Sequence, residues 1–228
     1  MTNRIQTPWA SLSPSATVVA VTKTFPFEAV AAARAMGLRH IGENRVEEAG
    51  EKIQETRERG FTDITWHMIG HVQSRKARET AALFDWVDSV DSVELLQKLD
   101  SAAGAFSKTL HVLLEVNLSG EKSKYGFDLT GWEKNPRKLK NSHILVYENL
   151  HLKNVIVEGL MTMAPYTTNL ETNRRLFQSM KKLSEAIRAQ IPSFGSQLSM
   201  GTSCDYQVAI EEGATQIRLG VALFGPRQ

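Results

Sequence analysis

Short apolar runs alternate with longer amphipathic segments along almost the whole chain. Runs rich in Val, Ile and Leu predict eight β-strands: Val18–Lys23, Arg39–Gly42, Thr65–Gly70, Trp86–Asp91, Leu110–Leu118, Val155–Met163, Gln197–Gly201 and Thr215–Gly220. Segments of helical spacing, most of them bounded by Gly or Pro, predict helices between these strands: Phe27–Met36, Arg45–Arg59, Ser74–Leu83, Val93–Ala103, Leu170–Gln190 and Asp205–Glu212. Because strands and helices alternate, we expect the strands to be parallel.

The number of strands favours an α/β fold with one closed (β/α)8 TIM barrel, forming a single domain over residues 1–228. No linker or break in composition interrupts the chain, and barrels of this kind commonly take about 250 residues. An open doubly wound parallel sheet is the structural alternative. The pattern is weakest over Gly131–Leu152, where Pro136 argues against one unbroken helix. A basic cluster there predicts a solvated helix face or loop rather than an anion site: Arg137, Lys138 and Lys140.

Composition narrows the class of protein. Hydrophobic residues make up 42% of the chain and charged residues 23%, which is ordinary for a globular protein. The net charge of +2, without a dense basic run interleaved with aromatics, gives no support for nucleic-acid binding. The single cysteine, Cys204, excludes an internal disulfide and suits a reducing compartment. No signal peptide and no membrane span of about 18 apolar residues is present, so we expect a cytoplasmic protein.

The candidate chemistry begins with Lys23, at the end of the first predicted strand. In a barrel the carboxyl ends of the strands surround the ligand site, so this lysine is expected in the mouth. A lysine in such a place can form a Schiff base with a carbonyl cofactor, for example pyridoxal 5'-phosphate (PLP). A surface lysine at a strand end is the alternative.

A phosphate site is expected from the loops after the seventh and eighth strands. Ser199–Ser203 is small and rich in hydroxyl groups and leads into a helix, while Gly220 ends the eighth strand. Barrel enzymes commonly bind phosphate between these two loops. A turn followed by a helix cap explains the same residues without a ligand.

Arg218 is a lone arginine in the last strand and is predicted to project into the barrel mouth. A pyridine nitrogen of PLP is one possible partner, and an arginine there would stay protonated, keep the nitrogen unprotonated and make the ring a poor electron sink. The alternative is a structural ion pair with Glu43 or Glu158. His67 is interpreted as a neutral core histidine, and the histidines show no metal-ligand spacing.

Six motifs in one order carry a family resemblance: Val19–Lys23, Gly42–Asn44, Trp66–Gly70, Gly159–Met163, Leu198–Gly201 and Ile217–Gly220 followed by Phe224-Gly225. Together they resemble the pyridoxal phosphate homeostasis proteins (YggS-type), whose single barrel is similar to the N-terminal domain of alanine racemase. The resemblance runs from about Val18 to Gly225.

The resemblance implies a cofactor site. Lys23 would form the internal aldimine, Asn44 would lie beside the ring and Arg218 would face the pyridine nitrogen. The phosphate would be held largely by backbone amides of the two loops: Ser199, Met200, Gly201, Gly220 and Val221. Met161, in the fourth motif, is predicted to line the same site. Lys122–Phe127 matches a family loop that borders the mouth.

Four positions depart from the family pattern. Thr202 stands where Met is usual, and Val221 replaces a Thr or Ser whose hydroxyl could contribute about 1 kcal/mol to phosphate binding. Arg75 replaces Asn, and Gln207 stands where Glu is common. These changes bear on affinity rather than on the identity of the site.

The resemblance implies a PLP-binding protein of intracellular vitamin B6 homeostasis without robust catalysis, expected to be a monomer with apo PLP-dependent enzymes as candidate partners. An alternative is a small fold-type III amino-acid racemase. Such racemases carry a second, mostly β domain, which we expect to be missing because the chain ends at Gln228, directly after its last strand. A third alternative is an aldolase-like enzyme in which Lys23 condenses with a sugar carbonyl, and it predicts a colourless protein.

Overall fold

Eight parallel strands close into a barrel in the computed structural model, which describes residues 16–226 except for the side chains of residues 147–149. The ring runs in the order of its strands: β1 (Thr17–Val21), β2 (His40–Glu43), β3 (Thr65–Met68), β4 (Trp86–Val90), β5 (Leu110–Asn117), β7 (Val155–Met161), β8 (Gln197–Thr202) and β9 (Gln216–Leu219). Pairing of β9 with β1, through Thr17↔Gln216 and Val19↔Arg218, closes the ring. The predicted closed barrel is therefore confirmed, and the open sheet is excluded.

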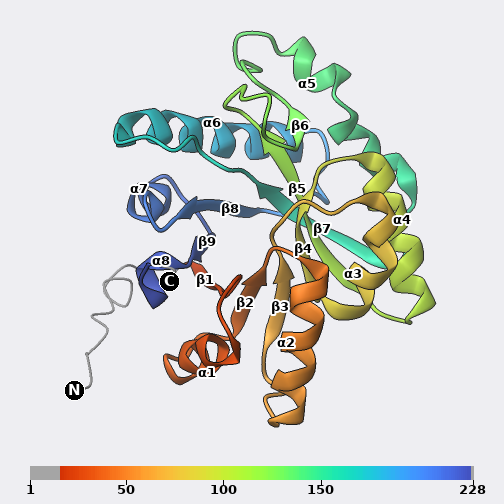
Figure 1. The fold of residues 1–228 in the computed structure, drawn as a ribbon. Coiled ribbons are helices and arrows are strands. Elements are labelled where there is room, and N and C mark those ends of the chain that lie inside the picture. Colours follow the sequence, from red (N-terminus) through yellow and green to blue (C-terminus); the bar gives the residue numbers. More distant parts are fainter. Residues whose placement is uncertain (1–15, 227–228) are drawn as a thin grey trace.

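The helices surround the ring on its outer side (Figure 1). They are α1 (Phe27–Ala35), α2 (Val46–Glu58), α3 (Ala77–Leu83, preceded by the 3-10 turn η2 at Ser74–Lys76), α4 (Val93–Ala105), α6 (Leu170–Arg188), α7 (Tyr206–Glu211) and α8 (Val221–Phe224). The longest, α6, shows why they pack there. Leu176, Phe177, Met180, Leu183 and Ile187 recur every three to four residues and are all buried, so one apolar face covers the barrel.

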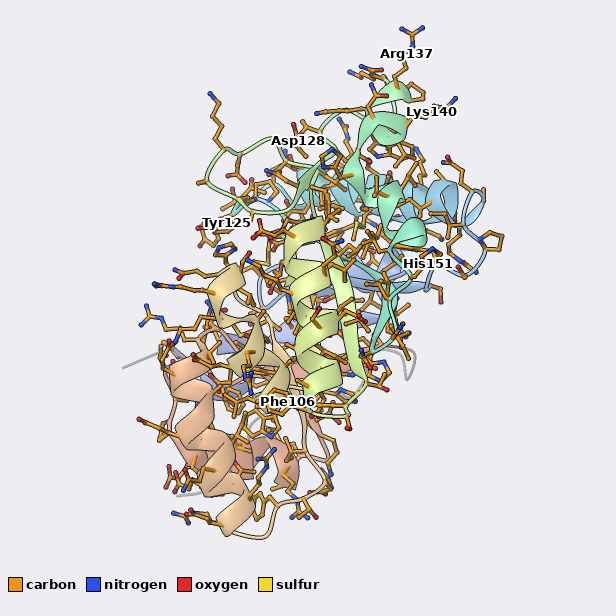
Figure 2. The ribbon with its side chains drawn as sticks, turned by 90° about the vertical axis from the view of Figure 1, so that its right-hand side faces the viewer. Phe106, Tyr125, Asp128, Arg137, Lys140 and His151 are labelled. Atoms are coloured by element: carbon orange, nitrogen blue, oxygen red, sulfur yellow. The ribbon has the colours of Figure 1, made fainter. Side chains whose placement is uncertain are left out.

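The weak segment after β5 contains no long helix. It consists of the two-residue strand β6 (Phe127–Asp128), which pairs with the end of β5, then α5 (Arg137–Asn141) and the 3-10 helix η3 (His143–Leu150). Pro136 lies directly before α5, where its missing N–H costs nothing, which agrees with the predicted break. Arg137 and Lys140 are exposed on α5 (Figure 2), as expected of a solvated face.

The structure corrects the end of the first strand. β1 ends at Val21, so Lys23 does not end the strand but lies two residues beyond it. The backbone N–H of Phe25 donates to the carbonyl of Thr22 at 3.0 Å, and Thr24 takes a φ of 65°. A hydrogen-bonded turn with its third residue in the left-handed region replaces the sheet ladder here.

Candidate functional site

A pocket opens at the carboxyl ends of the strands, where barrel proteins bind their ligands. Its volume is about 180 Å³, and ten residues line it: Val21, Lys23, Asn44, Ile69, Met163, Thr202, Ser203, Arg218, Gly220 and Val221. Five of the nine predicted cofactor residues are among them. The other four do not line the pocket: Met161, Ser199, Met200 and Gly201.

The turn that carries Lys23 is held from below by a buried ion pair. Lys52 Nζ lies 2.6 Å from Glu43 Oε1 and donates to the carbonyl of Thr22 at 2.8 Å. The hydroxyl of Thr22 donates to the same carboxylate at 2.5 Å, and the N–H of Thr24 donates to Glu48. Both residues that flank Lys23 are therefore anchored, which limits the directions that its side chain can take.

The same pair removes one alternative for Arg218. Burial raises the pKa of Glu43, while the hydrogen bonds from Lys52 and Thr22 lower it. Glu43 is thus the partner of Lys52, and Glu158 Oε1 lies 2.7 Å from His111 Nδ1. The hypothesis that Arg218 pairs with Glu43 or Glu158 is wrong, because both carboxylates have other partners.

Arg218 is almost completely buried at the inner end of the pocket. Its Nη1 donates to Ser199 Oγ at 2.5 Å, and its Nη2 donates to the carbonyl of Thr162 and contacts Met163 Sδ, both at 2.9 Å. Burial lowers the pKa of Arg218, whereas the charges of Asp88, Glu115 and Asp205 raise it. These contacts occupy three of the five guanidinium N–H groups, which leaves donors for a ligand.

Asn44 reaches the pocket because Gly70 makes room for it. A Cβ atom at Gly70 would lie 2.3 Å from the carbonyl oxygen of Asn44 and 2.9 Å from its Cγ. Any larger residue would displace the loop after β2. The glycine is visible in the sequence, but the need for it arises from the approach of two loops, which no sequence pattern shows.

A hydroxyl group links the loops after β8 and β9. Ser203 Oγ accepts hydrogen bonds from the backbone N–H groups of Gly220 at 3.1 Å and Ala222 at 3.2 Å. On the other side of the loop, Thr202 donates to Asp205 Oδ1 from its N–H and its hydroxyl, at 2.7 and 3.0 Å. A small cup of polar groups results, suited to an anion such as a phosphate.

The register of β8 decides which residues face this cup. Ser199 is paired with Gln216 and Thr202 with Arg218, so three steps along β8 match two along β9. This bulge turns Thr202 and Ser203 toward the pocket, whereas the hydroxyl of Ser199 faces Arg218 inside the barrel. Gly201 has a φ of +94°, and a Cβ there would lie 2.5 Å from Ala209 Cβ of α7.

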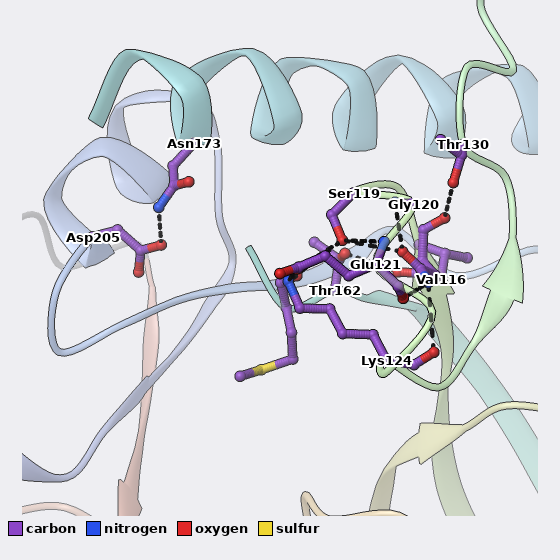
Figure 3. A network of polar contacts seen from close by, with 11 residues as sticks. Val116, Ser119, Gly120, Glu121, Lys124, Thr130, Thr162, Asn173 and Asp205 are labelled. Atoms are coloured by element: carbon purple, nitrogen blue, oxygen red, sulfur yellow. Dashed lines mark hydrogen bonds and ion pairs between the residues drawn. The ribbon is translucent and has the colours of Figure 1, made fainter. Parts of the chain in front are cut away.

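The loop after β5 is held by a network of polar contacts that includes Ser119, Glu121 and Lys124 (Figure 3). Lys124 Nζ donates to the carbonyl of Met163 at 3.2 Å, so the predicted bordering loop contacts a residue that lines the pocket. On the opposite side, Tyr125 stacks on His71 with 3.6 Å between ring centroids, and His71 lies 3.0 Å from Asp91. The loop is thereby tied to the segments that follow both β3 and β7.

The described residues contain neither a candidate metal cluster nor a candidate membrane span. Within residues 16–226 no group of three or more His, Cys, Asp or Glu side chains could hold a metal ion. In the same part of the chain, no helix is both long and apolar enough to span a bilayer.

Comparison with known proteins gives the class of protein to which this barrel and its site belong. Residues 2–228 match the family described as alanine racemase, N-terminal domain. Alanine racemase of Clostridium difficile shares the fold with a TM-score of 0.70 at 15% identity, over 96% of this chain and 55% of that one. At this level of identity the likeness concerns the fold alone.

Nearer relatives narrow the assignment. The chain is 38% identical to the pyridoxal phosphate homeostasis protein of Synechocystis sp. over 96% of this chain and 94% of the relative. It is 32% identical to the protein of the same name from Escherichia coli, over 92% and 86%. PipY of Synechococcus elongatus, solved with PLP bound, has a TM-score of 0.80 at 35% identity, over 95% of both chains. The chain belongs to the pyridoxal phosphate homeostasis protein family.

Proposed function

We propose that this chain binds PLP in the pocket at the barrel mouth and serves intracellular vitamin B6 homeostasis. Lys23 would hold the cofactor through its Nζ, Asn44 would lie beside the ring, and Arg218 would face the ring nitrogen. The phosphate would occupy the cup at Ser203, Gly220 and Val221. The observation that carries the proposal is the presence of an amine, a guanidinium and this anion cup around one small pocket.

The residues present fit the group. A phosphate needs donors, and the linked loops bring the backbone N–H of Val221, at the start of α8, and the hydroxyl of Ser203 to one end of the pocket. The guanidinium of Arg218 retains N–H donors for a ring nitrogen. Bound PLP supplies an aldehyde that condenses with an amine and a ring that can withdraw electrons.

The role we propose for the protein is to carry or buffer the cofactor, without robust catalysis. Among the ten lining residues, all within the described part of the chain, none is His, Tyr, Cys, Asp or Glu, so Lys23 is the one proton acceptor for a substrate. Racemisation needs a proton donor or acceptor on each face of the reacting carbon. An arginine at the ring nitrogen also keeps that nitrogen unprotonated.

We further propose that the protein is a monomer with a single domain, that it acts in the cytoplasm, and that its partners are apo PLP-dependent enzymes. The similar length of the relatives supports the single domain. Size-exclusion chromatography with light scattering tests the monomer.

The test of the function has two arms. Titration of the purified protein with PLP, followed by visible absorbance, should show saturable binding of one cofactor per chain. The loaded protein is then incubated with L-amino acids in D2O, and exchange of the α-proton and chirality are followed. Turnover near 1 s⁻¹ or above, within the ordinary range of enzymes, contradicts the carrier role. Absence of saturable binding contradicts the cofactor itself.

A further inference from the structure

A continuous chain of hydrogen bonds leads from Arg218 into the centre of the barrel. Arg218 Nη1 and Gln216 Nε2 both donate to Ser199 Oγ, at 2.5 and 2.9 Å. Gln216 Nε2 also donates to Asp88 Oδ2 at 2.5 Å, and Asp88 Oδ1 lies 3.0 Å from His67 Nδ1. Four side chains thus follow one another below the guanidinium.

These side chains cross the interior of the barrel. Asp88 belongs to β4 and Gln216 to β9, and these two strands are not neighbours in the ring, so their contact passes through the inside. Asp88, Ser199 and His67 are fully buried, and Gln216 is 3% exposed. Bulky branched residues usually fill the interior of a TIM barrel, whereas here a polar column occupies it.

Two donors of the column, on Gln216 and His67, converge on Asp88. A carboxylate oxygen only accepts, so Gln216 and His67 Nδ1 both donate to it from opposite sides. In neutral His67 the other ring nitrogen then accepts, and it lies 2.9 Å from His40 Nδ1. Burial lowers the pKa of His40 to about 4, which keeps that ring neutral. Asp88 is therefore the common acceptor of the column.

The polar column compensates the charge of Arg218 and fixes the direction of its guanidinium. Among the ion pairs of residues 16–226 none includes Arg218, although the side chain is 4% exposed. Asp88 gives the largest favourable charge that acts on it. The hydroxyl of Ser199 fixes Nη1, and Gln216, which shares that hydroxyl, is itself fixed by Asp88. Buried polar networks of this kind behave as units.

We propose that Asp88, acting through Gln216 and Ser199, is a positioning residue for Arg218 and sets the direction from which the guanidinium meets the ring nitrogen of the cofactor. The inference rests on the proposed function, since it concerns the same pocket. It adds that recognition of the ring nitrogen depends on a carboxylate that does not line the pocket.

The experiment compares PLP with its analogue in which CH replaces the ring nitrogen, by titrating the complete protein with each. A well-directed guanidinium favours PLP, because the analogue leaves a buried donor unpaired. Asp88→Asn keeps the volume, but Gln216 and His67 donate to different oxygens of Asp88, and an amide keeps only one of these acceptors. We expect the preference for PLP over the analogue to fall about tenfold, while affinity for the analogue changes little.

Two further variants make the comparison specific. Gln216→Met breaks both hydrogen bonds of the bridge and should reduce the preference in the same way, and it decides the matter if Asp88→Asn does not fold. Glu158→Gln is the matched control, because it also neutralises a carboxylate bonded to one imidazole, that of His111, without a hydrogen bond to this column. It should keep the preference of the natural protein.

The outcomes separate the inference from the proposed function. A natural protein that binds neither ligand, or an Arg218→Lys variant with an unchanged preference, overturns the placement of the cofactor. If Arg218→Lys abolishes the preference but folded Asp88→Asn and Gln216→Met keep it, only the positioning role is overturned. Equal losses of both ligands in the two variants also overturn it, because they indicate a general structural effect.

Discussion

Ser203 Oγ accepts a hydrogen bond from the backbone N–H of Gly220 at 3.1 Å, and this contact joins the loops that follow β8 and β9. The two residues are 17 positions apart in the chain. Their contact places a hydroxyl and the start of α8 on the same side of the pocket. The predicted anion cup therefore depends on both loops at once.

A negative charge at this contact should weaken PLP selectively. In Gly220→Asp the new Cβ would lie 3.5 Å from Val21, an ordinary contact, so the substitution adds a carboxylate next to the cup without a steric clash of its Cβ. We expect affinity for PLP to fall about tenfold or more through repulsion, and affinity for pyridoxal, which lacks the phosphate, to fall much less. Gly220→Asn is the isosteric neutral control. Equal losses for both ligands would place the cup elsewhere.

Lys23 should be the lysine that carries the cofactor. Borohydride treatment of the PLP-loaded protein should fix the label to the single peptide that contains Lys23, as read by mass spectrometry. Lys23→Ala should lose the visible absorbance band, because no other lysine lines the pocket within the described residues. Lys122→Ala, on the loop at the mouth, should retain it. Label on any other peptide of the natural protein would contradict the assignment.

Removing only one partner of the buried ion pair between Lys52 and Glu43 should destabilise the protein. Lys52→Met leaves the carboxylate of Glu43 buried without its cation, and we expect the free energy of unfolding to fall by about 3–5 kcal/mol. The double variant with Glu43→Gln should recover most of this loss. Lys98→Met, which removes the exposed pair with Glu94, should cost about 1 kcal/mol or less. Urea denaturation measures the free energy of unfolding of all three variants. A Lys52→Met variant as stable as the natural protein would contradict the stabilising role of the buried ion pair.

Glu115 should make stability depend on pH. Burial raises its pKa to about 7, although the charge of Arg218 opposes the shift. The folded state thus holds a proton that the unfolded state releases at lower pH. The stabilisation is complete below the unfolded pKa and is lost as pH rises through about 7.

Glu115→Gln should remove this dependence. Between about pH 5 and about pH 8, the natural protein should lose roughly 1–3 kcal/mol of unfolding free energy relative to the variant. Urea denaturation at the two pH values measures the difference, with Glu121→Gln as the exposed control. Parallel curves for Glu115→Gln and the natural protein would show that the carboxyl is ionised throughout this range.

The barrel could be predicted from the sequence because its signal is local. Each strand is a short apolar run, and the apolar residues of α6 recur every three to four positions. Both patterns can be recognised within a short stretch of sequence. The placement of Lys23, Asn44 and Arg218 at one pocket also followed, because strand ends converge in a barrel.

The rest of the site depends on contacts between distant segments. The resemblance predicted Ser199 for the phosphate, whereas the bulge in β8 brings Thr202 and Ser203 to the pocket and leaves the hydroxyl of Ser199 facing Arg218. Carboxylates were predicted as the alternative partners of Arg218, but its guanidinium donates to the hydroxyl of Ser199. That hydroxyl also accepts a hydrogen bond from Gln216. Neither the bulge nor the polar column produces a periodic pattern in the sequence. Ile69 and Met163, which were predicted as strand residues, line the pocket from positions beyond the ends of β3 and β7.

The extra residue in β8 also constrains how this strand can change over evolutionary time. Removing one residue between Ser199 and Thr202 would restore a regular ladder, place Thr202 on the same face as Ser199 and shift the loop that carries Ser203. A change of length would therefore abolish the anion cup even if every side chain remained. Substitutions that keep the spacing leave the backbone of the cup in place. The length of this strand is a stricter requirement than its composition.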